Sequence, residues 1–209
     1  MASIAHLARP GANDEGRMEV LHAAAEAFNA KGYTLTTIDD IADRMSATKG
    51  RVYHYYRTKA DIFLDVHLAA MELMLARVGP LARGEGTPSD RLYAMAAEHA
   101  RLVMDEFTMQ RAAIPAGELR IAADGASSPD AVRQVIALRD EYEQLYAEVI
   151  RDGLASGEFH AEADRLLTKF LLGALNWITM WFRRDGGADP ELIASECASF
   201  VLHGVRQVG

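Results

Sequence analysis

The segment from Arg44 to Lys59 reads RMSATKGRVYHYYRTK. It holds five Lys and Arg residues, three tyrosines and one histidine, and it contains no carboxylate. The whole chain of 209 residues, by contrast, carries a formal net charge of −8. Because binding to phosphates depends on the local field rather than on the net charge, this segment indicates contact with a nucleic acid.

The residues around the basic segment predict two short helices joined by a tight turn. Thr36 or Thr37 can cap a helix that runs through IDDIADRM, and Asp39 and Asp40 then lie in its first turn, where the helix dipole favours them. Thr48 can cap a second, shorter helix after two or three residues of turn. Two short helices of this kind, the second one basic, form a helix-turn-helix, whose second helix enters the major groove of DNA.

The second helix divides into two faces by residue spacing. The face expected to pack on the first helix carries Val52, Tyr55 and Tyr56. The side chains left to point outward, toward phosphates and base edges, belong to Lys49, Arg51, Tyr53 and His54. Gly50 costs about 1 kcal/mol relative to Ala inside a helix. We therefore expect something to approach the helix closely at Gly50, and the DNA backbone is a candidate.

Almost all of the remaining chain is predicted to be helical. Apolar residues recur with a helical period, and Gly or Pro marks most of the ends, with Gly32 as the stop of the first helix. The longer helices after it are expected over residues 59–83, 89–107, 128–156, 165–184 and 190–208. The helix over 165–184 is apolar around much of its circumference, so we expect it to be buried on several sides.

Composition excludes several classes of protein. The single cysteine, Cys197, rules out an internal disulfide and suits a reducing cytosol. The N-terminus lacks a continuous apolar signal region, and the longest uncharged apolar stretch, residues 170–182, is too short to span a bilayer. We expect a soluble cytoplasmic protein with no membrane partner.

The sequence predicts no catalytic residue, metal or cofactor. It contains no Gly-rich phosphate loop and no nucleophile elbow, so an enzyme is not expected. Glu158, His160, Glu162 and Asp164 lie close together, but no second histidine stands at the spacing of a metal-binding pair.

The segment from Arg17 to Phe63 closely resembles the DNA-binding domain of the TetR family of transcriptional regulators. The likeness rests on AAAEAFNAKGY, TTIDDIA, TKGRVYHYY and TKADIF, and it runs without a gap. Ser46 lies in the turn where the family often has glycine. Since serine tolerates most turn geometries, this departure carries little weight.

The resemblance implies an all-α homodimer that binds a palindromic operator, usually as a repressor, and is released by a small molecule. Residues 1–58 would form the helix-turn-helix domain, with an N-terminal arm whose Arg9 would touch the minor groove. Residues 59–209 would form a helical bundle for ligand binding and dimerisation. By position, Thr37 and Lys59 would anchor phosphates at helix N-termini. The groove-facing set would be Thr48, Lys49, Gly50, Arg51, Tyr53 and His54.

The C-terminal segments RDEYEQLYAEVIRDGLASGEF and ALNWITMWFRRDG are similar to a branch of the family that responds to acyl-CoA thioesters. Methionines such as Met71 and Met74 could line an acyl tunnel. Arginines that could bind the CoA phosphates are Arg120, Arg139, Arg183 and Arg184. The predicted ligand-binding residues are Met95, His99, Arg139, Tyr142, Asn176, Trp177, Met180 and Arg183. The alternatives are a different aromatic or hydrophobic effector, or none.

The apolar faces of the last two predicted helices are too large for a soluble monomer. We expect them to pair with their symmetry mates in a four-helix interface. The residues predicted in that interface are Phe170, Trp181, Cys197, Phe200 and Val201. Such a dimer would place its two recognition helices in successive major grooves, with centres about 34–36 Å apart.

Overall fold

The computed structural model describes residues 12–114, 129–160 and 164–206. Within them the regular elements are helices, so the predicted all-α class is confirmed. Their bounds are α1 Ala12–Leu35, α2 Ile38–Arg44, α3 Lys49–Tyr55, α4 Lys59–Ala82, α5 Pro88–Asp105, α6 Phe107–Ala113, α8 Pro129–Ser156, α9 Asp164–Asn176, α10 Ile178–Trp181 and α11 Pro190–Val205. None of the helices described is long and apolar enough to cross a membrane.

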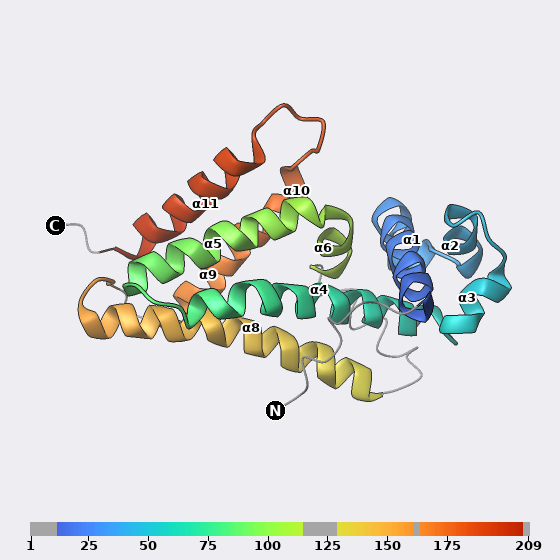
Figure 1. Ribbon diagram of the computed structural model, residues 1–209, viewed down its shortest axis with the longest axis horizontal. Helices are drawn as coiled ribbons and strands as arrows, with labels where there is room; N and C mark the ends of the chain where they lie inside the picture. The colour runs from blue at the N-terminus through green and yellow to red at the C-terminus, as the bar shows by residue number, and fades with distance from the viewer. Residues whose placement is uncertain (1–11, 115–128, 161–163, 207–209) are drawn as a thin grey trace.

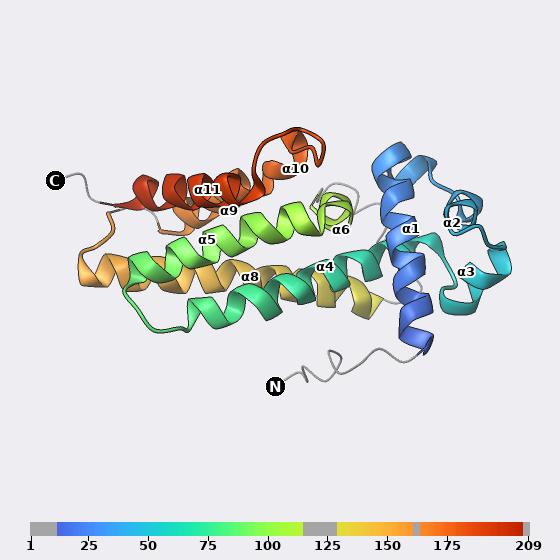
Figure 2. The same ribbon diagram turned by 45° about the horizontal axis from the view of Figure 1, so that its top comes forward.

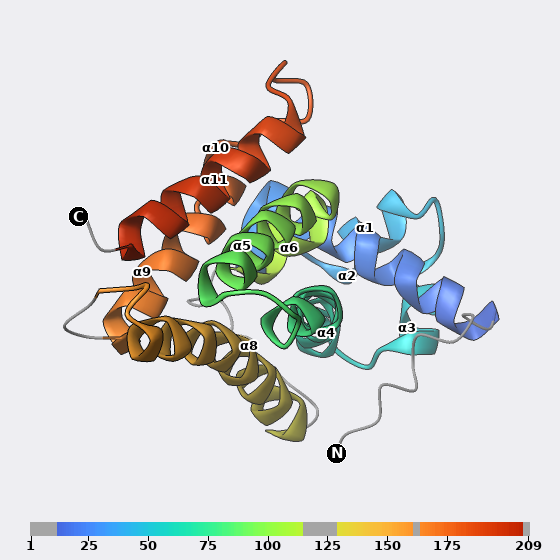
Figure 3. The same cartoon turned by 60° about the vertical axis from the view of Figure 1, so that its left-hand side comes forward.

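The helices form a head and an elongated bundle (Figures 1 and 2). We call α1, α2 and α3 the head, which stands at one end of the molecule. The long helix α4 leads away from the head and runs along α8. In the end-on view, α5 lies between α4 and the pair α9 and α11 (Figure 3).

Three helices begin with the same local device, a threonine followed three residues later by an aspartate. Thr37, Thr58 and Thr87 each form a capping box at the start of α2, α4 and α5. In each box the threonine hydroxyl accepts a hydrogen bond from the aspartate N–H, and the carboxylate accepts one from the threonine N–H. Such a cap contributes roughly 1 kcal/mol, and it fixes where the helix begins.

The core of the head extends beyond the head itself. Phe28 of α1 packs edge to face against Phe63 of α4, with ring centroids 5.2 Å apart. Met109 and Ala112 of α6 are buried in the same cluster. The Asn29 amide also donates to the Thr108 carbonyl at 2.8 Å. The first turns of α4 and the short helix α6 therefore share a core with residues before the predicted boundary at residue 58.

A lysine joins the end of α1 to the start of α4. Gly32 has the backbone angles φ 74° and ψ 161°, which break the helical path near the end of α1 as its position predicted. The Lys59 ammonium donates to the carbonyls of Tyr33, Thr34 and Thr36 at 2.6, 3.2 and 2.7 Å. These carbonyls have no helical partners ahead of them, so Lys59 closes the end of α1.

Two predictions about helices were wrong. The single helix expected over residues 165–184 is divided into α9 and α10. The Thr179 hydroxyl donates to the Asn176 carbonyl at 2.8 Å, and the Met180 N–H bonds the Trp177 carbonyl three residues back instead. Helix α6 was also missed, because the sequence predicts a break over residues 111–128, which include the last three residues of this helix.

The turn between α2 and α3 is less tolerant than its sequence suggested. Ser46 has φ 50°, in the left-handed region that residues with a Cβ rarely adopt. We expect Ser46→Gly to raise the free energy of unfolding by about 1 kcal/mol. Urea denaturation at pH 7.5 measures this, with Ser46→Ala as a control that should bring no gain. An equal gain from alanine would show that φ at this position is not the cause.

Candidate nucleic-acid interface and cavity

Helix α3 lies at the tip of the head, on the side away from the bundle (Figure 1). Val52 and Tyr56 are buried and Tyr55 is half-buried, so this face packs inward as its spacing predicts. The exposed side of the helix and its cap is formed by Thr48, Lys49, Gly50, Arg51, Tyr53 and His54. The structure thus brings six predicted DNA-binding residues to one surface, and Tyr53 is 54% exposed on it.

Gly50 is not required by its own surroundings. A Cβ built there would meet only the Thr48 hydroxyl, at 3.6 Å, which is an ordinary contact. The helix therefore carries a glycine that costs it about 1 kcal/mol without any need inside the described chain. A close approach of the DNA backbone at Gly50 therefore stays a prediction that the described contacts leave room for.

The cations of α3 are paired with carboxylates on neighbouring helices. The Lys49 ammonium lies 2.8 Å from the Asp39 carboxylate of α2. The Arg51 guanidinium donates to the Glu19 carboxylate of α1. All four side chains are about half exposed, so these pairs are open to water and to other anions.

The two predicted phosphate anchors behave differently. Thr37 is exposed at the N-terminus of α2, where its hydroxyl also donates to the Asp40 carboxylate at 2.9 Å. Lys59 uses its three N–H donors on the carbonyls at the end of α1. Lys59 thus braces the end of α1, and its contact with a DNA phosphate stays a prediction. Arg9, expected in the minor groove, lies outside the described residues.

An ion pair where the head meets α4 fixes α1 and α3 to that helix. The Arg17 guanidinium donates to the Asp65 carboxylate through Nε, at 2.8 Å, and through Nη2. The Tyr56 hydroxyl, at the end of α3, donates to the same carboxylate. Burial and the nearby Asp65 charge raise the pKa of the Tyr56 hydroxyl, which stays protonated. This cluster fixes the orientation of α3 relative to α1 and α4.

A cavity of about 290 Å³ lies between α4, α5, α6, α8 and α9. Its walls combine apolar side chains with amide, imidazole, phenol and charged groups. The lining residues are Met71, Met74, His99, Gln110, Ala113, Ile114, Arg139, Tyr142, Glu143, Lys169, Leu172, Gly173 and Asn176. Size and mixed polarity suit a small organic molecule.

A hydrogen-bonded chain runs along one wall of the cavity. His99 Nε2 lies 3.2 Å from Asn176 Oδ1, and His99 Nδ1 lies 2.9 Å from the Tyr142 hydroxyl. Because an amide oxygen only accepts, Nε2 carries the proton and Nδ1 accepts from Tyr142. Burial lowers the pKa of His99 to about 4, so the ring is neutral at pH 7.

The cavity holds one cation without a carboxylate partner. Lys169 bonds both oxygens of the Glu143 carboxylate, at 2.9 and 3.0 Å. Arg139 donates to the Ile114 carbonyl at 3.3 Å, and among the described residues no carboxylate pairs with it. Burial lowers the pKa of Arg139, which shows that its charge is partly withdrawn from water. The lining therefore has a net positive charge in a chain of net charge −8.

The structure brings together half of the predicted ligand-binding set: His99, Arg139, Tyr142 and Asn176. Met95 is fully buried in the core instead. Trp177, Met180 and Arg183 are exposed and do not line the cavity, because the break after Asn176 turns this segment outward. Of the other arginines proposed for CoA, Arg184 binds the Asp105 carbonyl on the surface, and Arg120 lies outside the described residues.

The missed lining residues fall into two groups. Lys169, Leu172 and Gly173 share a helical face with Asn176, and Glu143 shares one with Arg139 and Tyr142. Extending Asn176 back by three, four and seven positions, and Arg139 forward by four, would have found them. Gln110, Ala113 and Ile114 come from α6 and its C-cap, and no predicted helix indicated this part of the lining.

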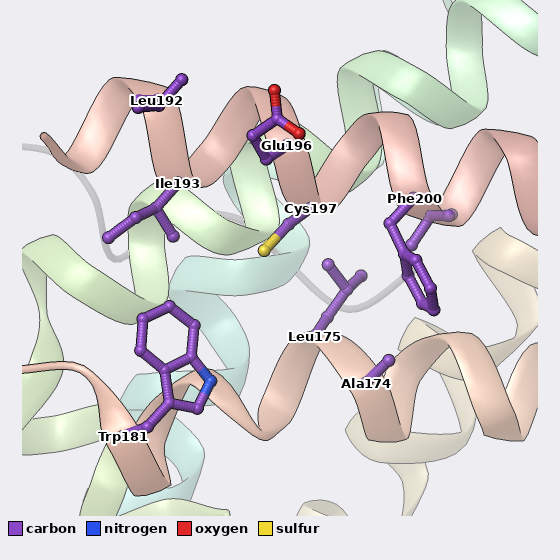
Figure 4. Close-up of a pocket in the computed structure, with 9 residues that line it drawn as sticks. Ala174, Leu175, Trp181, Leu192, Ile193, Glu196, Cys197 and Phe200 are labelled. Atoms are coloured by element: carbon purple, nitrogen blue, oxygen red, sulfur yellow. The ribbon is translucent and has the colours of Figure 1, made fainter. Parts of the chain in front are cut away.

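An apolar groove of about 490 Å³ runs between α9, α10 and α11 (Figure 4). Trp181 and Phe200 point into it from opposite helices, and Cys197 is half-buried between them. Phe170 and Phe200 are 71% and 68% exposed. Val201, also predicted in the interface, lines the groove but is fully buried by its neighbours. The described residues contain no group of ligands that could hold a metal.

Comparison with known proteins matches both parts of the chain. The profile of the bacterial regulatory proteins of the tetR family matches residues 20–66. A profile described as a tetracyclin repressor-like C-terminal domain matches residues 85–205.

Three relatives show how far the similarity extends. The HTH-type transcriptional repressor KstR2 of Mycobacterium tuberculosis is 22% identical over 202 residues, which are 92% of this chain and 94% of that protein. The fatty acid metabolism regulator protein of Bacillus subtilis is 20% identical over 191 residues, 90% of this chain and 95% of its own. The fold is similar to that of AibR in complex with isovaleryl coenzyme A and operator DNA, with a TM-score of 0.74 and 22% identity over 88% of this chain and 97% of AibR.

Proposed function

The chain belongs to the TetR family as a DNA-binding transcriptional repressor, and from this premise we propose that it binds a palindromic operator as a homodimer and is released by a small hydrophobic effector. An acyl-CoA thioester is the first candidate for the effector. A different aromatic or hydrophobic molecule, or control without a small molecule, is the alternative. The proposed place of action is the cytoplasm.

The position of the cavity carries the proposal. Two of its walls also hold the head: α4 is continuous with the core of the head, and α6 packs on α1. On α6, Met109 and Ala112 face the head, while Gln110 and Ala113 face the cavity. A molecule that fills the cavity would therefore contact α4 and α6, the two helices on which the head packs.

The lining favours an amphipathic effector with a negative charge. Met71, Met74 and Leu172 offer adaptable apolar contact for an acyl chain. Arg139 offers a planar, partly desolvated cation for a carbonyl, carboxylate or phosphate oxygen. At about 290 Å³ the cavity can enclose an acyl group but not a whole CoA, whose nucleotide would lie outside. The ligand bound by AibR and the name of the Bacillus relative favour a thioester.

The apolar groove supports the proposed dimer. Its exposed aromatic side chains form a continuous surface along α9, α10 and α11, and association of two copies would remove that surface from water. A two-fold axis there leaves both heads free to bind successive major grooves about 34–36 Å apart.

The effector is tested by fluorescence anisotropy on an operator selected by the protein from random DNA. We expect octanoyl-CoA to dissociate the complex and free CoA to do so poorly, because CoA lacks the acyl chain. A tenfold loss of operator affinity requires about 1.4 kcal/mol of coupling, and operator DNA should weaken effector binding by the same factor. Octanoate is measured alongside to distinguish the free acid from the thioester.

Arg139→Met should weaken binding of the effector about tenfold, because a charge-assisted hydrogen bond is lost. In the absence of effector, the affinity for the operator should be unchanged. Arg183→Met is the matched control, since Arg183 is exposed and outside the cavity. Release by an unrelated aromatic compound but by no acyl compound would exclude the acyl-CoA assignment. No release by any compound, with operator binding intact, would favour a repressor without a small effector.

A further inference from the structure

The carboxylate of Glu19 lies beside the DNA-reading surface, where a negative charge opposes binding to phosphates. Glu19 is on α1 and accepts a hydrogen bond from Nη2 of Arg51, a residue of the outward face of α3. The two side chains are 44% and 48% exposed. An ion pair this exposed contributes little to folding, so stability does not account for its position.

The position of Glu19 within its helix does not account for it either. Asp39, which pairs with Lys49, stands in the first turn of α2, where the helix dipole favours a carboxylate. Glu19 is in the second turn of α1, beyond the region in which the dipole acts. What distinguishes Glu19 is its contact with Arg51.

The pair restricts how Arg51 can meet DNA. A guanidinium has five N–H donors, and the hydrogen bond to Glu19 engages Nη2 alone. The remaining donors can still form the two parallel bonds to guanine O6 and N7 that identify this base. A free arginine would also be attracted to any phosphate nearby, whatever the sequence. The carboxylate weakens that attraction by offsetting the charge of Arg51.

We propose that Glu19 is a specificity-determining residue of this repressor. It lowers the affinity for DNA of any sequence and holds Arg51 in position for a base contact. Both effects increase the ratio of the affinity for the operator to the affinity for random DNA. This inference rests on DNA binding by α3 and is independent of the effector.

The test compares two substitutions at Glu19 on two DNAs, by fluorescence anisotropy at two salt concentrations. The probes are a random-sequence duplex and an operator that the wild-type protein selects from a random pool. Glu19→Gln keeps a hydrogen-bond acceptor and removes the charge. We expect it to bind the random duplex about fivefold more tightly, equivalent to roughly 1 kcal/mol, with a steeper salt dependence and a much smaller change on the operator.

Glu19→Ala removes the acceptor as well, so operator affinity should also fall about threefold, because Arg51 is no longer held. Glu26→Gln is the matched control: Glu26 is also exposed on α1, but it faces Arg44, at 3.6 Å, rather than α3. In an Arg51→Ala background, Glu19→Gln should no longer change the ratio of the two affinities.

Three results would overturn the proposal. One is a ratio of operator to random-DNA affinity that Glu19→Gln leaves unchanged. Another is an effect of Glu26→Gln as large as that of Glu19→Gln, which would indicate net charge rather than position. The third is a full effect of Glu19→Gln without Arg51. Each of these leaves operator binding and effector release intact, so the proposed function would stand.

Discussion

Phe200→Asp is expected to convert the proposed dimer into monomers and to weaken operator binding by roughly a hundredfold or more. Phe200 is 68% exposed and points into the apolar groove between α9 and α11. A carboxylate there would have to leave water without a partner when two copies associate, which costs several kcal/mol. A monomer keeps one reading helix and loses the second half-site, whose binding in the dimer is intramolecular.

Analytical ultracentrifugation at micromolar concentration measures the mass, and anisotropy measures the affinity. Ile136→Asp is the control, because Ile136 is 48% exposed on α8, outside the groove. It should remain a dimer with normal affinity. A dimeric Phe200→Asp variant would place the interface elsewhere, and a monomeric variant with full operator affinity would remove the need for a dimer.

Acid is expected to destabilise the protein by several kcal/mol between pH 6.5 and pH 4. His67 and His99 are each 1% exposed, and burial lowers the pKa of each to about 4. His67 Nδ1 lies 2.9 Å from the Phe63 carbonyl, and Nε2 has no hydrogen-bond partner within residues 12–114, 129–160 and 164–206. The charge of Arg139 lowers the pKa of His67 further. The imidazoles are therefore neutral in the folded state at pH 7.

The sign follows from the unfolded chain, where a histidine has a pKa of about 6.5. Above that value neither state binds the proton, and the stability is fully present. As the pH falls from 6.5 to 4 the unfolded state alone becomes protonated, and each histidine removes about 3 kcal/mol. Below pH 4 the folded state is protonated too, and this loss levels off. For a protein with 5–15 kcal/mol of stability the effect is large.

Urea denaturation at pH 7.5, 6, 5 and 4, at one protein concentration, gives the free energy of unfolding directly. His67→Gln and His99→Gln should each flatten the dependence between pH 6.5 and 4, even if either variant is less stable at pH 7.5. A pH dependence that both variants leave unchanged would assign the loss to other groups.

The parts of the fold that could be predicted from sequence are those set by neighbours along the chain. Helix α4 was expected over residues 59–83 and spans Lys59–Ala82, because its threonine cap is local. Helix α8 ends at Ser156 as expected, just before Gly157, whose φ of 80° ends the helix. The outward face of α3 could be predicted for the same reason, since helical spacing alone assigns it.

The features that sequence missed depend on residues far apart in the chain. Lys59 binds carbonyls more than twenty residues earlier, and nothing in its own surroundings indicates those partners. The break after Asn176 accompanies the bond of its side chain to His99, 77 positions away. After that break, Trp177 and Met180 are exposed and do not line the cavity, although the sequence predicted them as ligand-binding residues with Asn176. The left-handed turn at Ser46 was missed because the glycine that the family often has there, which favours positive φ, was given little weight.

The hydrogen bonds of Lys59 and the ion pair between Arg17 and Asp65 couple the head to α4. Both fix α1 to the first two turns of α4, so the head follows any tilt of this helix. Met71 lies twelve residues beyond Lys59, roughly 18 Å along the helix axis. A tilt of roughly 10° at the cavity therefore carries the head by roughly 3 Å, close to the 3.4 Å step between base pairs. In the proposed dimer, opposite displacements of the two heads by this amount would change their spacing by about 6 Å, nearly two base-pair steps.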